Sequence, residues 1–280
     1  MLPISRNLFV VLLLICCDLA VGAQDSSDTH PYLTDTFFLD IGLFFPDREL
    51  NLSVDGSTGG DNAIIDFGEE FRLKESDETF AIDLGWQFGE RWRLVGQYFE
   101  SSGSSTWILD EDIEWGDVVF LEGTNASVGS SFKLIRAFVG RDLNASEKHE
   151  FGIGAGIHWL EIGAFIGGTI LTGGGETASG FESVTTQGPV PNIGAWYKYS
   201  ISGNWALRGR VDWFGASIGK YDGRLTNTSI GVNYQVARNF GIGLNYHNFK
   251  LNVAVDESDW RGRVITRYEG LYLYLSFYWQ

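Results

Sequence analysis

The sequence predicts an all-β protein, a transmembrane antiparallel up-and-down β-barrel of about ten strands, and the pattern is compatible with eight to twelve. Three observations predict this fold. Apolar and polar residues alternate along many segments. Short polar turns and longer loops alternate between these segments. No stretch after residue 23 is apolar for the ~18 residues of a spanning helix, so a membrane protein with this sequence must cross with strands. A secreted β-sandwich or jelly roll would also show alternation, but it would not need so many aromatic residues on its exposed face.

The first 23 residues have the pattern of a secretory signal peptide. Arg6 supplies the positive charge, the apolar core covers Leu8 to Cys17, and Val21 to Ala23 form a small-residue cleavage site. Asp18 ends the apolar run well short of the ~20 residues of a membrane anchor. We therefore expect the mature chain to start near residue 24, with residues 24–34 as a loose periplasmic lead-in and residues 35–280 as the barrel.

Charge and cysteine content exclude several function classes. Both cysteines, Cys16 and Cys17, lie in the predicted signal peptide, so the mature chain would have no disulfide, thiolate nucleophile or cysteine-ligated metal. Removing the segment takes away one base and one acid, so the net charge of −16 is unchanged. Such an acidic balance argues against nucleic acid as a partner.

Ten segments carry the strand pattern. They cover residues 37–45, 80–88, 92–99, 128–140, 151–159, 190–199, 205–213, 230–236, 242–246 and 270–280. The facing of the fourth is open, because Phe132, Leu134 and Phe138 compete with Ile135, Ala137 and Val139 for the lipid side. In the fifth, the apolar phase slips at Leu160, which predicts a β-bulge. A Gly/Thr/Ser-rich loop is expected over residues 167–187.

The connections alternate in length, as in a barrel whose short turns face the periplasm. The short turns are expected near Glu90, Asn144, Asn204 and Asn239, and the long external loops near Gly60, Glu114, Gly174, Asp222 and Glu257. Three of the four short turns are followed at once by an aromatic residue, namely Trp92, Trp205 and Phe240. This recurrence predicts an aromatic girdle at the periplasmic interface.

The last segment is apolar on one face, with Leu271, Leu273, Leu275, Phe277 and Trp279, and tyrosine-rich on the other. It looks like the closing strand of an outer-membrane β-barrel, and the whole pattern resembles small outer-membrane barrels of the OmpA/OmpW type. The resemblance implies a location in the outer membrane, contact with outer-membrane lipid and lipopolysaccharide, and recognition of the C-terminal strand by the barrel assembly machinery. It specifies an architecture and no single activity.

If the apolar residues face lipid, the charged residues of the strands face the interior. A charge on the lipid face at mid-membrane would cost about 2–4 kcal/mol. We therefore predict a lumen charge network of Asp40, Asp83, Arg93, His158, Arg208, Arg210, Asp212 and His247. Its acids and bases would pair into a polar plug. A narrow ion path through the same residues is the alternative.

The sequence predicts no enzyme, catalytic residue, cofactor or metal site. Omptin-type proteases, which also have about ten strands, carry an Asp-x-His pair at the outer rim, and no predicted strand or external loop of this chain contains such a pair. Lipid A deacylases and outer-membrane phospholipases place a serine near a histidine, and neither His158 nor His247 has a serine at a comparable offset. The predicted function is a structural or narrow-pore barrel with acidic external loops. The alternatives are a barrel that binds a ligand or surface through its loops, and a lipid A-modifying enzyme.

Two predicted external loops are strongly acidic. One contains Asp110, Glu111, Asp112, Glu114 and Asp117, and the other contains Asp256, Glu257 and Asp259. A solvated face that keeps the loops apart explains such clusters. Divalent cations bridging to anionic lipid are the alternative, because oxygen-rich sites suit hard cations.

Overall fold

The computed structural model describes residues 28–55, 64–66, 79–110, 112–115, 118–171, 177–218, 221–256 and 261–280. The predicted signal peptide and the first part of the predicted lead-in lie outside these residues. So do Gly60, Gly174, and parts of both acidic loops, including Glu111, Asp117, Glu257 and Asp259. No helix among the described residues is long and apolar enough to cross a membrane.

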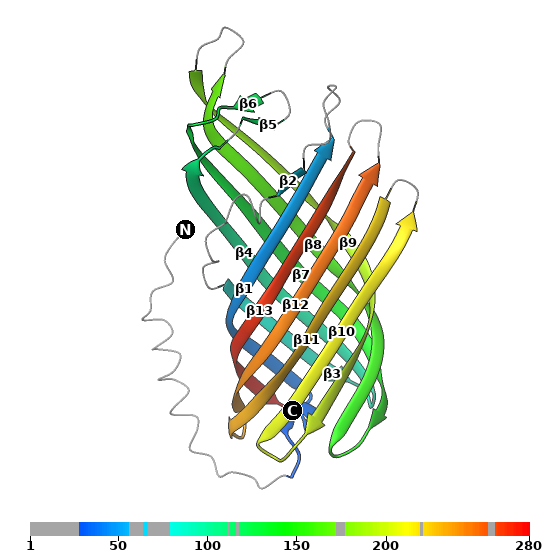
Figure 1. Cartoon of the computed structure of the whole chain (residues 1–280). Helices are drawn as coiled ribbons and strands as arrows, with labels where there is room; N and C mark the ends of the chain where they lie inside the picture. Colours follow the sequence, from blue (N-terminus) through cyan, green and yellow to red (C-terminus); the bar gives the residue numbers. More distant parts are fainter. Residues whose placement is uncertain are drawn as a thin grey trace.

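Ten long antiparallel strands close into a barrel (Figure 1). They are β1 (Phe37–Asp55), β3 (Thr79–Phe88), β4 (Trp92–Ile108), β7 (Asn125–Ala145), β8 (His149–Leu171), β9 (Thr177–Ser200), β10 (Trp205–Ile218), β11 (Tyr221–Ala237), β12 (Phe240–Asp256) and β13 (Arg261–Trp279). The first and last strands pair along their whole length, from Phe37–Trp279 to Asp55–Arg261. The predicted fold class is confirmed.

Three short strands and one helical turn complete the described elements. The short strands are β2 (Ile64–Asp66), β5 (Ile113–Trp115) and β6 (Val118–Phe120), and the helical turn is α2 (Pro31–Thr34). β2 pairs with β1, and the β5–β6 hairpin joins β8 through Phe120 and Ile170. These strands lie at the end of the barrel that carries the long connections (Figure 1).

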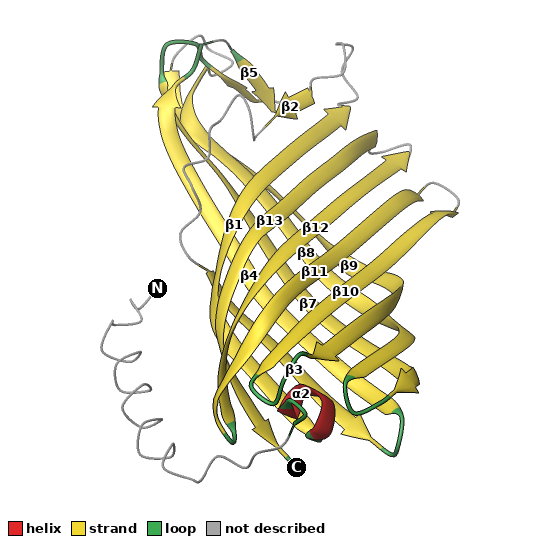
Figure 2. Cartoon of the chain, turned by 60° about the horizontal axis from the view of Figure 1, so that its bottom comes forward, coloured by secondary structure: helices red, strands yellow, loops and turns green. Residues whose placement is uncertain are grey.

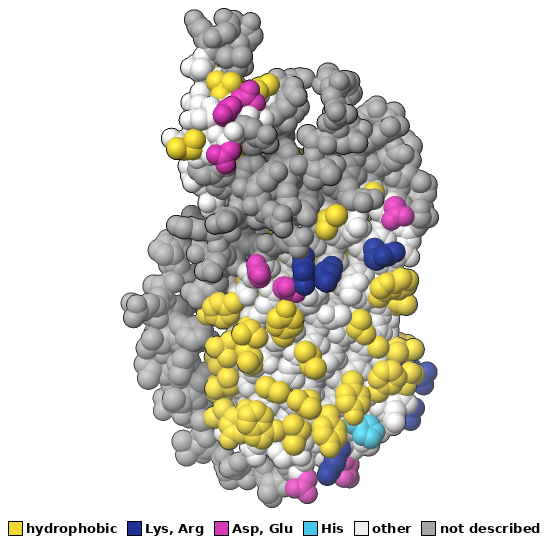
Figure 3. Space-filling model, viewed as in Figure 1, with side chains coloured by type: hydrophobic (Ala, Val, Ile, Leu, Met, Phe, Trp, Pro, Cys, Tyr) yellow, Lys and Arg dark blue, Asp and Glu magenta, His cyan; other side chains and the backbone are white. Residues whose placement is uncertain are grey.

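The exterior of the barrel carries an apolar belt. Figure 3 shows hydrophobic side chains gathered on the lower half of one face, with charged side chains above and below them. At the short-turn end, Phe37 stacks with Trp86 and Trp279, at ring-centroid distances of 5.9 and 6.1 Å. Trp205 packs on Tyr234 at 4.8 Å. These rings form an aromatic girdle at the end where it was expected.

Two predictions about the strands are wrong. Residues 167–171 and 177–187 belong to strands and not to a loop, because β8 continues to Leu171 and β9 begins at Thr177. There is also no bulge at Leu160, which pairs with Leu134 in an unbroken register. Among the described strand pairs, the register shifts lie at Asp142/Asn144 and at Gln235/Ala237.

The apparent slip at Leu160 has another cause. The alternation of β8 is regular, but the side of the barrel on which the apolar residues lie changes there. Below this point His158 faces inward and Trp159 outward, whereas above it Leu160 faces inward and Glu161 outward. Where a strand leaves the membrane its outer face meets water, so the apolar residues move to the inside.

The facing of β7 is settled by burial. Phe132, Leu134 and Phe138 are buried in the interior, while Ile135 and Val139 are 43% and 42% exposed on the outside. The interior therefore has two parts, a polar part within the belt and an apolar part above it.

Candidate functional site

Strand β10 presents Arg208, Arg210 and Asp212 to the interior, where Asp212 is completely buried. Trp205 and Trp213 lie on its outer face and are exposed. Two-residue periodicity produces this division. Space for Asp212 comes from its neighbour on β9, Gly194, since a Cβ there would collide with Oδ1 of Asp212.

Asp40 is the centre of one cluster of charges. Its carboxylate accepts hydrogen bonds from Arg208 Nη1 (2.5 Å), Tyr32 Oη (2.7 Å) and Ser276 Oγ (2.6 Å). Arg208 Nη2 also lies 3.8 Å from Asp83 Oδ2. Three donors, one of them charged, offset the hydration that a completely buried carboxylate loses.

Asp212 is the centre of a second cluster. Arg136 Nη2 donates a hydrogen bond to it (2.8 Å) and Arg136 Nε forms an ion pair with it at 2.7 Å, while Arg210 Nε lies at 3.8 Å. His158 Nε2 approaches to 3.7 Å. The guanidinium of Arg136 also lies over the ring of Phe138, 4.3 Å from its centroid, which adds a cation–π contact.

Glu150 is the centre of a third cluster, near the short-turn end. It accepts from Arg93, from Trp196 Nε1 (2.7 Å), and it pairs with Lys198 Nζ at 3.2 Å. Arg93 Nε also lies 3.5 Å from Asp142. All three clusters are inside the barrel.

All eight residues predicted for the lumen network lie inside the barrel, as their burial and contacts show. His247 joins the network only weakly, with its ring against Phe44 and Tyr272. Five further members were not predicted: Tyr32, Arg136, Asp142, Glu150 and Lys198. Tyr32, Asp142 and Glu150 lie in or beside segments interpreted as lead-in or turn. Arg136 is on the strand for which the sequence left open which face points to lipid. Lys198 could have been found, because it alternates with the outward Tyr197.

The charges of the network balance. Among the described inward residues, the five bases Arg93, Arg136, Lys198, Arg208 and Arg210 meet the five acids Asp40, Asp83, Asp142, Glu150 and Asp212. Only a small cavity, of about 80 Å³, lies among them. Paired charges therefore occupy the lumen at this level.

The end of the predicted lead-in is not loose. Residues 30–34, which we call the N-terminal plug, pack into the short-turn end of the barrel (Figure 2). Tyr32 reaches the Asp40 cluster, its carbonyl accepts from Lys198 Nζ (3.2 Å), and the backbone N–H of His30 donates to Ser200 Oγ (3.0 Å). The plug thus covers the network from the periplasmic side.

The burial of His30 predicts that docking of the plug depends on pH. It precedes the membrane-spanning strands, and its ring packs on Tyr32 and Tyr278. Burial lowers its pKa from 6.5 to about 4, with a smaller contribution from Lys198 and an opposing hydrogen bond to Asn233. The unfolded state therefore binds the proton more tightly, and the free energy of unfolding should fall as the pH drops from 6.5 towards about 4.

His30→Asn should flatten this part of the pH profile. Asparagine retains an acceptor for the N–H of Tyr32, which His30 Nδ1 now caps at 3.2 Å, but it does not titrate. Urea unfolding in lipid vesicles, followed by tryptophan fluorescence, measures both profiles. Parallel profiles for the two proteins would show that protonation of His30 does not control docking.

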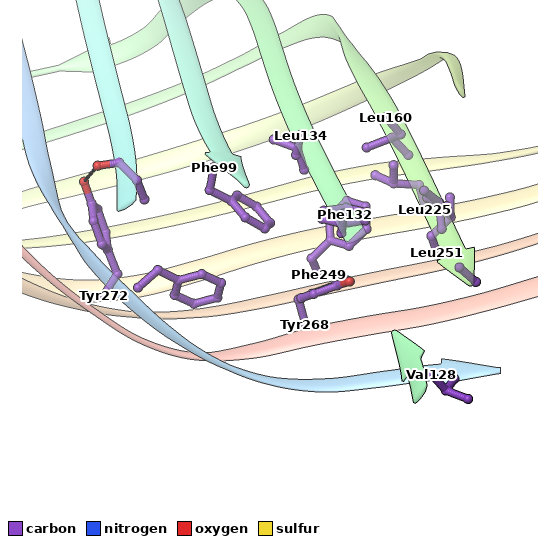
Figure 4. Close-up of a cluster of buried hydrophobic side chains, with 14 of the residues drawn as sticks. Phe99, Val128, Phe132, Leu134, Leu160, Leu225, Phe249, Leu251, Tyr268 and Tyr272 are labelled. Atoms are coloured by element: carbon purple, nitrogen blue, oxygen red, sulfur yellow. Dashed lines mark hydrogen bonds between the residues drawn. The ribbon is translucent and has the colours of Figure 1, made fainter. Parts of the chain in front are cut away.

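Above the network an apolar layer fills the lumen (Figure 4). Phe132 lies at its centre, with ring-centroid distances of 4.3 Å to Tyr268, 5.2 Å to Phe249 and 5.4 Å to Phe99. Leu134, Leu160 and Leu225 pack beside it. The expectation of a polar interior is therefore wrong above the belt, where a second closed layer consists of hydrocarbon.

Two histidines, His158 and His247, lie inside the barrel. His158 hydrogen-bonds with Asn227 (3.2 Å) and faces Asp212, with no serine in contact. His247 lies opposite Ser229 across β11–β12, but these two described side chains share no hydrogen bond. Among the described residues there is also no group of three or more potential metal ligands.

Solved structures with the same architecture are outer-membrane proteins. The outer membrane protease OmpT from Escherichia coli superposes with a TM-score of 0.58 at 12% identity, over 88% of this chain and 97% of that one. This chain has the fold of an outer-membrane β-barrel. Neither a protein-family model nor a curated protein sequence matches it.

More distant barrels also match. The toluene transporter TodX of P. putida matches at 10% identity, with a TM-score of 0.35, over 89% of this chain and 92% of that one. Ail, the attachment invasion locus protein of Yersinia pestis, matches at 11% identity, with a TM-score of 0.30, over 86% and 98%. At these identities and TM-scores the two matches do not distinguish one activity from another.

Proposed function

We propose that this protein is a structural outer-membrane barrel with an axially closed lumen, which presents its long strands and acidic loops at the cell surface. The observation that carries the proposal is the pair of stacked layers that block the interior. The lower layer is the balanced charge network, and the upper layer is the hydrocarbon around Phe132.

Both layers oppose ion passage, each for a different reason. An ion in the lower layer would have to displace a paired buried charge and leave its partner without compensation. An ion in the upper layer would have to lose its hydration shell among side chains that offer no replacement. The N-terminal plug is part of the lower layer, because Tyr32 donates to Asp40 and accepts from Lys198.

Planar-bilayer recording tests the closed lumen. We expect no discrete conductance steps from the wild-type protein. Arg210→Leu should lower the temperature at which the barrel loses its heat-modifiable gel mobility, because Arg210 faces Asp212 and donates to Gln97 Oε1 (3.0 Å). It should still not conduct, because the upper layer is intact. Regular single-channel steps in the wild type would contradict the proposal and favour the narrow pore.

The proposal assigns the protein no catalytic activity. Its support is the position of His158 and His247, which lie among packed side chains inside the barrel. Its partners are proposed to be the surrounding lipid and lipopolysaccharide, and the assembly machinery that engages β13. Mass spectrometry of lipid A from expressing cells tests the alternative enzyme, and a changed acylation pattern would contradict the structural role.

A further inference from the structure

Strand β9 loses its partner on one side at the upper end of the apolar belt. β9 and β10 pair from Ser200–Ala206 to Ile193–Trp213, and no described residue pairs with the other part of this β9 edge, Thr177–Asn192. β10 continues to Ile218 and there pairs with β11 alone. In Figure 1 the outer end of β10 points to the right, whereas the β8–β9 hairpin ends at the upper left. We call residues 188–192 and 214–218 the β9–β10 seam.

Two prolines lie on the unpaired edge. Pro189 and Pro191 keep their pairing with Trp159 and Ile157 of β8 without a register shift. The missing N–H of each proline is therefore on the side that faces β10, since the β8 ladder is intact. A proline cannot donate to a ladder, so pairing with β10 cannot simply extend past Ile193. The edge also presents no N–H at these positions, which an apolar environment would otherwise leave unsatisfied.

Apolar side chains lie on both sides of the seam, next to the buried amide of Asn192. On the membrane side, Ile193 is 59% and Trp213 is 49% exposed. On the inner side, Val190 and Phe214 are only partly buried, and both pack against the apolar layer of the lumen. Side chains of the apolar lumen layer and of the apolar belt therefore lie on either side of the gap in the β9–β10 pairing.

We propose that the seam binds the hydrocarbon chain of an outer-leaflet lipid, which enters from the side and lies against Val190 and Phe214. The apolar lining selects an alkyl chain, and the polar headgroup stays outside among the exposed residues of β9. An added peptide strand fits this edge poorly, because strand addition requires the donors that Pro189 and Pro191 lack. This lateral site does not depend on whether the lumen conducts along its axis.

Photolabelling of the mature protein in nanodiscs tests the proposal. The probe is a phospholipid with a diazirine at the end of one acyl chain, and mass spectrometry locates the adducts. We expect adducts on the inward side chains Val190 and Phe214, in addition to the outward Ile193 and Trp213. Adducts on outward residues alone would overturn the proposal, since a sealed wall would give that result.

A matched pair of variants adds a second measurement. Val190→Trp fills the seam, and we expect a severalfold loss of adducts on Phe214. Val184→Trp places the same ring on the same face of β9, six residues nearer the outer end of the barrel, and should leave those adducts unchanged. Heat-modifiable gel mobility shows whether each variant folds. If Val190→Trp does not fold, Ala216→Trp, which fills the seam from β10, takes its place. Undiminished labelling of Phe214 in a folded, filled variant would also overturn the proposal.

Discussion

Asp212→Ala should lower the free energy of unfolding by roughly 3–5 kcal/mol, the cost of leaving a buried charge without its partner. The carboxylate is completely buried, accepts a hydrogen bond from Arg136 Nη2 (2.8 Å) and forms an ion pair with Arg136 Nε at 2.7 Å. Arg210 lies near the same carboxylate. The substitution therefore leaves two guanidinium groups in the lumen with their main counter-charge removed.

Urea unfolding in lipid vesicles, followed by tryptophan fluorescence, measures this loss. The double variant Arg136→Met with Asp212→Leu should recover most of it, because replacing both members of a buried pair with apolar residues is often neutral. Asp222→Ala, at an exposed position on β11, is the control and should change stability by no more than about 0.5 kcal/mol. A similar small effect for Asp212→Ala would mean that water solvates Asp212, and the network would not close the lumen.

The strands could be predicted because a membrane imposes a strict alternation on them. Within the belt, a residue such as Trp213 must face lipid, and its neighbour Asp212 must then face inward. This reasoning places Asp40, Arg208 and Asp212 without any knowledge of how the strands pair. It depends only on whether each side chain points to lipid or to the interior, and the two-residue alternation of a strand gives this directly from the sequence.

Partner choice could not be predicted, because it depends on register between strands far apart in the chain. Arg136 and Asp212 lie on β7 and β10, and Tyr32 reaches Asp40 from a segment outside the strands. The apolar layer was missed for a different reason. Within the membrane, apolar side chains such as Trp159 face outward to lipid. Above the membrane the outside of the barrel meets water and the interior is apolar, so applying the same rule to Leu160 would place it outward, which is wrong.

Phe132→Ala should cost roughly 3–5 kcal/mol of unfolding free energy, as expected for a large buried aromatic side chain whose loss leaves a cavity. Phe132 is completely buried, and three aromatic rings lie within 5.4 Å of its centroid. Ile135→Ala is the matched control on the same strand. Its side chain is 43% exposed on the outer face, so lipid can fill the space and the loss should be much smaller.

Phe132→Ala also tests whether the charge network and the apolar layer are two successive barriers along the lumen. Phe132→Ala alone should not conduct, because the charge network below it is intact, and Arg210→Leu alone should not conduct either. The double variant thins both barriers on one path and should give measurable single-channel steps in a planar bilayer. Its stability loss should be close to the sum of the single losses, since Phe132 and Arg210 share no contact among the described residues. Conduction by Phe132→Ala alone would show that the aromatic layer is the only barrier, and that ions pass the charged residues below it while those remain paired.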